Sequence, residues 1–113
     1  MILQQTDSYI KACMKTWLLC ESCIHAETMS DSPREALINK CRNCANSCFT
    51  VVCRIINYSD AVQESAFNCL LNCRECYQEC EASADSEDIV HCATVCRNCA
   101  DMLKSLMIPF NQN

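Results

Sequence analysis

The sequence predicts an all-α fold, an antiparallel up-down-up-down four-helix bundle with a cysteine-lined core. The chain of 113 residues contains no glycine and only two prolines, and it is rich in residues that favour helices. Its cysteines recur at spacings of three and four residues, which is the repeat of one helix face. Three short polar segments with helix-start signals divide the chain into four similar parts. We therefore expect a single domain over residues 1–113.

The first helix is expected over residues 7–28 and the second over residues 33–57. The segment SDSPREAL separates them and carries several helix-start signals. Ser32 suits the N-cap, Pro33 suits the first helical position, and Glu35 would close a capping box. At 1.5 Å per residue, helices of this size are about 33–37 Å long.

The third helix is expected over residues 60–82. The segment NYSDAVQ ends the second helix and starts the third at Ser59 or Asp60, with Gln63 three residues after Asp60. Either side chain can accept a hydrogen bond from a free backbone N–H at the helix start.

The fourth helix is expected over residues 86–107. In EASADSEDIV, Asp85 or Ser86 is the expected N-cap. Pro109 is expected to stop the helix, because proline has no N–H to donate. All the connections are short, so consecutive helices must run antiparallel.

Thirteen of the fourteen cysteines fall on the helix faces expected to turn toward the bundle axis. Spacings of three and four produce the a/d seam of a bundle, so these thiols would line its interior. One or two such residues would be ordinary small core side chains, but leucine, isoleucine and valine would fill a core better than thirteen thiols. Cys53 lies about 120° from the seam at 100° per residue. The seam cysteines are Cys13, Cys20, Cys23, Cys41, Cys44, Cys48, Cys69, Cys73, Cys76, Cys80, Cys92, Cys96 and Cys99.

A disulfide scaffold is the usual explanation for so many cysteines in a short chain. Side chains three or four apart on a helix have Cβ atoms about 5–6 Å apart. A disulfide needs about 3.5–4.5 Å, so bonds within a regular helix would be strained. Bonds between helices would staple a bundle whose connections are already short. The disulfide interpretation is therefore disfavoured.

Metal binding suits a thiol-lined axis better, and Cu(I) suits it best. Two thiolates can hold one Cu(I), a soft ion that accepts two-coordinate binding. When Cu(I) ions and thiolates approach equal numbers, the buried charge approaches zero, whereas four thiolates around each Zn²⁺ leave −2 per site. Zinc and iron–sulfur sites usually draw their cysteines from loops, but thiols from several helices could also supply them.

The charge and hydropathy of the chain exclude some partners. The net charge of −5 leaves no basic stripe for nucleic acid. No segment approaches membrane-spanning length, so we expect no membrane partner. The N-terminal MILQQTDSYIKACMK lacks a basic start followed by a long apolar run, so we expect a cytoplasmic location, where thiols stay reduced.

The two ends of the bundle are expected to differ. One end gathers apolar residues into a plug, namely Ile10, Trp17, Val52, Ile55, Ile56, Ala66, Leu103, Leu106 and Phe110. The other end carries Cys23, Cys41, Cys80 and Cys92, and we expect metal to enter there. Acidic residues surround it, although acids in first helical turns also favour the helix dipole. They are Glu27, Asp31, Glu35, Glu79, Glu81, Asp85, Glu87 and Asp88.

Several side chains outside the seam are candidate peripheral ligands or modulators. The end where we expect metal to enter also carries His25, Met29 and His91. Both histidines are about 100–120° off the seam at 100° per residue. Cys53 is a possible peripheral thiol. Three arginines each follow the first cysteine of a C-x-x-C pair, and they either lower nearby thiol pKa values or simply face solvent. They are Arg42, Arg74 and Arg97.

The pattern resembles the Cys-rich four-helix-bundle copper storage proteins, the Csp family, and specifically their cytosolic branch. The resemblance rests on C-x-x-x-C-x-x-C-x-x-x-C over residues 69–80, its shortened copies at 41–48 and 92–99, and C-x-x-C at 20–23. It implies a bundle whose interior thiols hold many Cu(I) ions, often as a homotetramer. Cytosolic members tend to carry more cysteines in the first helix, where this chain has Trp17 and Leu18.

The leading hypothesis is a protein that binds and stores Cu(I), with exchange to a copper chaperone or a small thiol. No constellation of nucleophile and base stands out, so we expect no enzymatic activity. A zinc or iron–sulfur protein is the first alternative and predicts about three ions at four thiols each. A thiol redox sensor or sulfur carrier is the second.

Overall fold

The structure is a computed structural model that describes the backbone of residues 3–111 and the side chains of residues 6–107. Four α-helices account for most of the residues in this range, as the sequence predicts. Their bounds are α1 (Leu3–Thr28), α2 (Glu35–Ile56), α3 (Val62–Ala82) and α4 (Glu87–Asn111).

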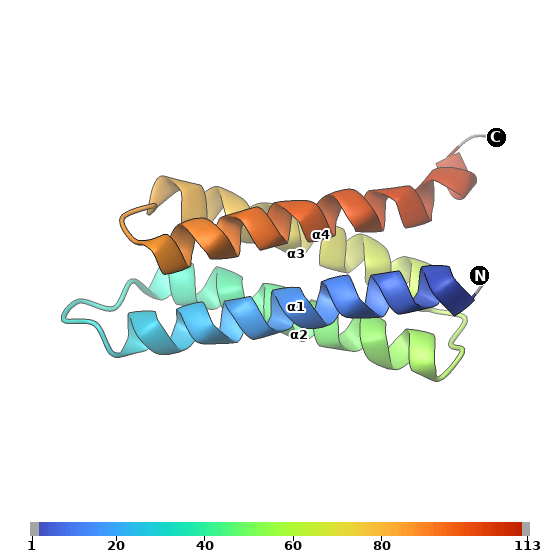
Figure 1. The fold of residues 1–113 in the computed structure, drawn as a ribbon, viewed down its shortest axis with the longest axis horizontal. Coiled ribbons are helices and arrows are strands. Elements are labelled where there is room, and N and C mark those ends of the chain that lie inside the picture. The colour runs from blue at the N-terminus through green and yellow to red at the C-terminus, as the bar shows by residue number, and fades with distance from the viewer. Residues whose placement is uncertain (1–2, 112–113) are drawn as a thin grey trace.

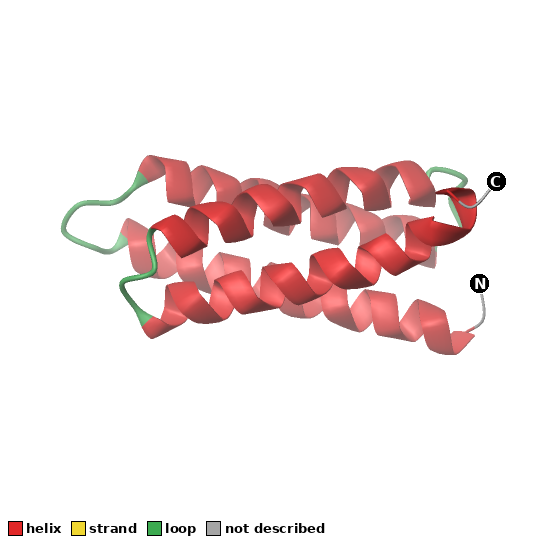
Figure 2. Ribbon diagram, turned by 90° about the horizontal axis from the view of Figure 1, so that it is seen from above, coloured by secondary structure: helices red, strands yellow, loops and turns green. Residues whose placement is uncertain are grey.

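The helices form an elongated bundle of 47 × 26 × 20 Å. Each packs against its neighbours in sequence, and α1 also packs against α4, which closes the bundle. The helix directions alternate along the chain, so both described chain ends lie at one end of the bundle (Figure 1). The same end holds the α2–α3 connection, and the other two connections lie at the opposite end (Figure 2). We call this opposite end the Cys23 end.

The start of α2 differs from the expected capping box. Arg34, in an extended conformation, occupies the N-cap position and makes no side-chain cap hydrogen bond. Its backbone N–H instead donates to the Glu27 carboxylate at 2.7 Å. Because the end of α1 already satisfies this donor, Ser32 and Glu35 are not used as a box, and the helix begins two residues later than predicted.

The end of α2 shows how a chain without glycine closes a helix. Tyr58 adopts a left-handed conformation with φ 54°, the position where glycine is usually found. The Ser59 N–H donates to the Arg54 carbonyl at 2.9 Å, and the Tyr58 N–H donates to the Ile55 carbonyl at 3.1 Å. This pair of bonds is a Schellman motif. The Ser59 hydroxyl then accepts from the Ala61 N–H at 3.0 Å in the turn before α3.

The starts of the last two helices and the end of α4 only partly follow the sequence predictions. The first helical residue of α3 is Val62, so the expected start at Ser59 or Asp60 is too early. Ser86 does cap α4, because its hydroxyl accepts from the Ile89 N–H at 3.3 Å. The expectation that Pro109 stops α4 is wrong, since the helix continues to Asn111. The fixed φ of proline is compatible with a helical turn. Its missing N–H removes only one backbone hydrogen bond there.

The interior consists of the thiols, an apolar layer at the end that holds the α2–α3 connection, and further apolar side chains, such as Leu37, toward the Cys23 end. Of the predicted plug, the residues that are buried are Val52, Ile55, Ala66, Leu103 and Leu106. Ile10 and Trp17 are half-buried, and Trp17 packs against Phe49 with ring centroids 6.4 Å apart. Ile56 is exposed, contrary to expectation, and the side chain of Phe110 lies outside the described residues. Within residues 3–111, no helix is long and apolar enough to cross a membrane.

Candidate metal centre

All thirteen seam cysteines are buried, as their helical spacing predicts. They come from all four helices, with three from each of α1, α2 and α4 and four from α3. Each is exposed by 3% or less. Cys53 is half-buried and does not join them. The bundle therefore carries a row of free thiols along its axis, which we call the thiol array.

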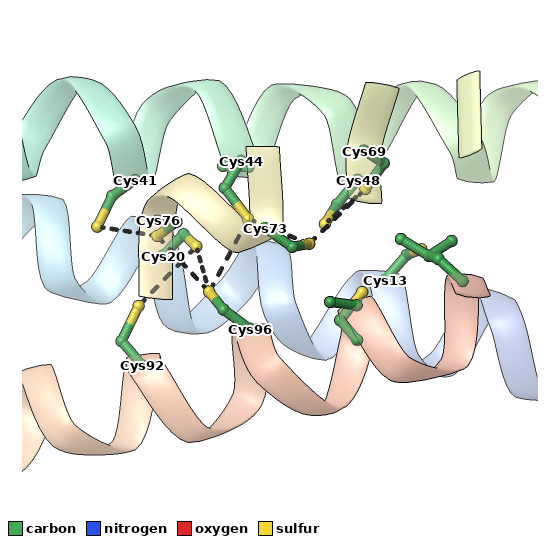
Figure 3. Packing of buried hydrophobic residues seen from close by; sticks show 14 of the residues in the cluster. Cys13, Cys20, Cys41, Cys44, Cys48, Cys69, Cys73, Cys76, Cys92 and Cys96 are labelled. Carbon is green, nitrogen blue, oxygen red and sulfur yellow. Dashed lines mark hydrogen bonds between the residues drawn. The ribbon is translucent and has the colours of Figure 1, made fainter. Parts of the chain in front are cut away.

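The sulfur atoms of the array touch one another across the helices (Figure 3). Near the middle, the Cys96 sulfur lies 3.6 Å from that of Cys76 and 3.8 Å from that of Cys20. Toward the end that holds the α2–α3 connection, the sulfurs of Cys48 and Cys69 are 3.6 Å apart. Such separations are contacts between thiols and not disulfide bonds, which are about 2.05 Å long.

The array contains several groups whose sulfurs all lie within 4.8 Å of one another. Two groups contain four thiols and two contain three, and every member is buried. A soft metal ion needs two to four such ligands at short range. The groups are Cys20, Cys44, Cys76 and Cys96; Cys41, Cys76, Cys80 and Cys92; Cys13, Cys48 and Cys99; and Cys44, Cys48 and Cys73.

The thiols also control one another's pKa. Hydrogen bonds with Cys13 and other thiols lower the pKa of Cys69 to about 6. Hydrogen bonds with Cys23 and other thiols lower the pKa of Cys80 to about 5. Contacts with neighbouring thiols, together with burial, raise the pKa of Cys20. Contacts among the thiols thus shift their pKa values in both directions, and thiolate is the form that binds metal.

The predicted role of the arginines is not found for Arg97. Its guanidinium pairs with Glu81 and lies over the Tyr77 ring, 4.4 Å from the centroid. The thiol pKa shifts come from other thiols and from burial, as in Cys69. A solvent-facing cation is therefore the better description of Arg97.

The Cys23 end has a small cavity that reaches the array. The cavity measures about 260 Å³, and Cys23, Glu27, Arg34 and Asp85 are among its lining residues. Cys23 is buried to 3% exposure, whereas Cys41, Cys80 and Cys92 are fully buried. Of the four cysteines expected at this end, Cys23 is thus the one that lines this opening.

Arg34 spans this opening and was not predicted to have a role there. Its guanidinium donates to Glu27 at 2.9 Å and to Asp85 at 3.0 Å. The hydrogen bonds from the Arg34 side chain and backbone lower the pKa of Glu27 to about 2. In the sequence, Arg34 is a cation between acidic segments, which is the one sign of such a role. Its pairing with Asp85 could not be predicted, because the two residues are far apart in sequence.

The acidic rim is therefore partly neutralised. Glu27 and Asp85 pair with Arg34, and Glu81 pairs with Arg97. The soft and imidazole side chains proposed as peripheral ligands, His25, Met29 and His91, are all exposed. They are accessible to an incoming ion but are separate from the buried thiol groups.

One further buried residue of α1 lies on the seam between two of the thiols. Thr16 lies between Cys13 and Cys20 and is fully buried. Its hydroxyl donates to the Ala12 carbonyl at 2.8 Å. The hydroxyl is thus satisfied by its own helix, so Thr16 interrupts the α1 thiols without leaving a buried polar group unpaired.

A comparison with family models gives the same assignment as the resemblance in the sequence. A family model described as Copper storage protein (Csp) matches residues 2–107. No curated protein and no solved structure matches the chain. The matched range includes all four cysteine-bearing helix segments and every thiol of the array. The chain therefore belongs to the copper storage protein (Csp) family.

Proposed function

We propose that this protein stores multiple Cu(I) ions on the thiol array and is not an enzyme. The observation that carries the proposal is the packing of thirteen buried thiols against one another along a single axis. Thiolate sulfur is the ligand that Cu(I) prefers, and two thiolates are enough for one ion. Family membership supports copper as the stored metal.

The charge of the filled array favours a monovalent ion. One Cu(I) on two thiolates leaves a net charge of −1 in the core, and further ions on shared sulfurs reduce it. Thirteen thiolates filled with divalent ions at four sulfurs each would leave −2 per site. Because a buried net charge is costly, the neutral arrangement of many Cu(I) ions is favoured.

Anaerobic titration of the reduced protein with Cu(I), against a chromophoric chelator, tests the proposal. We expect saturation at about ten or more ions per chain, since bridging thiolates are shared between ions. Saturation at one to three ions would reject storage. Replacing the exposed His25 and His91 with alanine should leave this capacity unchanged, which separates core from peripheral binding.

We infer that metal enters at the Cys23 end. Cys23 lines a cavity of about 260 Å³ at this end, and Met29, His25 and His91 are exposed beyond it. Replacing Cys23, Cys41, Cys80 and Cys92 with alanine should slow Cu(I) uptake more than replacing Cys13 and Cys69. Equal slowing by both sets would contradict uptake at this end.

We further propose that the protein works in the reducing cytoplasm, as a homotetramer, and exchanges Cu(I) with a copper chaperone or a small thiol. All fourteen cysteines are free, and free thiols persist in a reducing compartment. The tetramer rests on the family resemblance. Sedimentation should give a mass of about four times 12.8 kDa. A sedimentation mass equal to that of one chain would contradict the tetramer.

A further inference from the structure

Four thiols near the middle of the array converge on one point, and each comes from a different helix. Cys96 of α4 lies 3.8 Å from Cys20 of α1, 3.9 Å from Cys44 of α2 and 3.6 Å from Cys76 of α3, measured between sulfurs. Figure 3 shows these contacts meeting at Cys96. All four sulfurs lie within 4.8 Å of one another, and all four residues are fully buried.

Four sulfurs, one from each helix and all within 4.8 Å of one another, can surround a single metal ion. Zinc binds thiolates at about 2.3 Å, so the edges of a regular tetrahedron of sulfurs around it are about 3.8 Å long. The three separations from Cys96 are within about 0.2 Å of this value. A Cu(I) ion held by two thiolates would not need four converging sulfurs. We propose that, when the array holds no copper, Cys20, Cys44, Cys76 and Cys96 form a site for a single Zn(II) ion, a role beyond the proposed storage of Cu(I).

A second layer of thiols can stabilise the charge of this site. Binding releases the four thiol protons, so Zn²⁺ and four thiolates give a complex of charge −2. The Cys20 sulfur lies 3.9 Å from that of Cys92, and the Cys44 sulfur lies 3.6 Å from that of Cys73. The Cys76 sulfur lies 3.7 Å from that of Cys41. Each outer thiol can donate a hydrogen bond from its S–H to a ligand thiolate, as second-layer groups do in other metal sites.

A neighbouring group of four thiols competes with this site. It consists of Cys41, Cys76, Cys80 and Cys92, and it shares Cys76 with the proposed site. Two of its members, Cys76 and Cys80, come from the same helix. Filling both groups would require Cys76 to bridge two ions. We therefore assign one zinc ion per chain, at the group that has one ligand from every helix.

Titration of the reduced, metal-free protein with Zn(II) under anaerobic conditions, against a chromophoric chelator, tests the site. We expect one tightly bound ion per chain. Co(II) in its place should give the intense visible bands of tetrahedral cobalt and the charge-transfer bands of four thiolates. Absence of tight binding, binding of three or more equivalent ions, or an octahedral cobalt spectrum would overturn the proposal. These measurements need no variant.

Two matched variants locate the ion. Cys96→Ser removes a ligand of the proposed site only, and Cys80→Ser removes a ligand of the competing group only. We expect Cys96→Ser to weaken zinc binding at least 100-fold and to change the cobalt spectrum, while Cys80→Ser leaves both unchanged. The reverse result would overturn the assignment. Cys20→Ser repeats the test if Cys96→Ser does not fold, as judged by circular dichroism.

A variant of an outer thiol and the Cu(I) capacity provide two further tests of the zinc site. Cys73→Ala, which removes the hydrogen-bond donor, should weaken zinc binding by about 10–100-fold without changing the four-sulfur cobalt spectrum, because Cys73 acts on a ligand and is not one. The Cu(I) capacity is measured separately on the same protein. One zinc ion together with a low Cu(I) capacity would reject copper storage and support the zinc site. A high Cu(I) capacity without tight zinc binding would support copper storage and reject the zinc site.

Discussion

The Glu27 carboxylate accepts three hydrogen bonds from Arg34, at 2.7 Å from the backbone N–H and at 2.9 Å from both Nε and Nη2. Arg34 also donates to both oxygens of Asp85, at 3.0 and 3.3 Å. One arginine thus joins the connection before α2 to the connection before α4, across the cavity that reaches Cys23.

Arg34→Ala should lower the thermal stability of the metal-free protein. The substitution leaves the Glu27 carboxylate, which is 6% exposed, without its charged partner, and a buried unpaired charge is unfavourable. Thermal unfolding followed by circular dichroism measures the effect. Arg97→Ala is the matched control, because its partner Glu81 is exposed and surface ion pairs contribute little. An equal loss in both variants would contradict the role of Arg34.

The stability should depend on pH through Glu27. Its pKa is lowered from 4.5 to about 2, first by the side-chain hydrogen bonds from Arg34. A lowered pKa gives stability that is fully present above the unfolded-state pKa and is lost as the pH falls through the folded-state value. We therefore expect progressive loss between about pH 4.5 and pH 2. Urea unfolding across this range measures it, and Glu27→Gln should flatten this part of the curve.

Two leucines at opposite ends of the array offer a direct test of which end admits copper. Leu37 lies next to the thiols at the Cys23 end and Leu103 at the other end, and both are almost fully buried. Either change to alanine should cost about 2–5 kcal/mol and leave a cavity. We expect Leu37→Ala alone to speed Cu(I) uptake in stopped-flow experiments. Faster uptake in Leu103→Ala, with no change in Leu37→Ala, would place the opening at the other end.

Tyr58→Gly should stabilise the protein. Tyr58 has a positive φ and is 93% exposed, so its side chain contributes little packing and its backbone conformation is unfavourable. Glycine adopts this conformation freely, which should gain about 1 kcal/mol. For a chain of this size, that corresponds to a rise in Tm of about 4 °C. Tyr58→Ala, which keeps the Cβ, should give no such rise, and a gain in both variants would point to a different cause.

The sequence was sufficient to predict the helices and the thiol array because both depend on local periodicity. Spacings of three and four place the thiols on one face of each helix, and the bundle buries that face. Cys53 was correctly separated from the array by the same angle argument. The helix starts were less predictable, because the first free N–H of α2 is satisfied by Glu27, a residue of the preceding helix.

Contacts between segments far apart in sequence could not be predicted. The bridge from Arg34 to Asp85 depends on which connections meet at the Cys23 end and on the side-chain conformation of Arg34. The convergence of Cys20, Cys44 and Cys76 on Cys96 depends on the axial register of four helices. A shift of one helix by a single turn would keep every buried face and change every sulfur neighbour.

Both described chain ends lie at the end of the bundle away from Cys23, on a body 47 Å long (Figure 1). A fluorescent protein, an affinity tag or a surface linker attached at either terminus would therefore leave the Arg34-bridged opening free. The protein can be immobilised or fused through both termini at once without obstructing that opening. A molecule tethered through its termini would direct the cavity lined by Cys23 and Arg34 into solution.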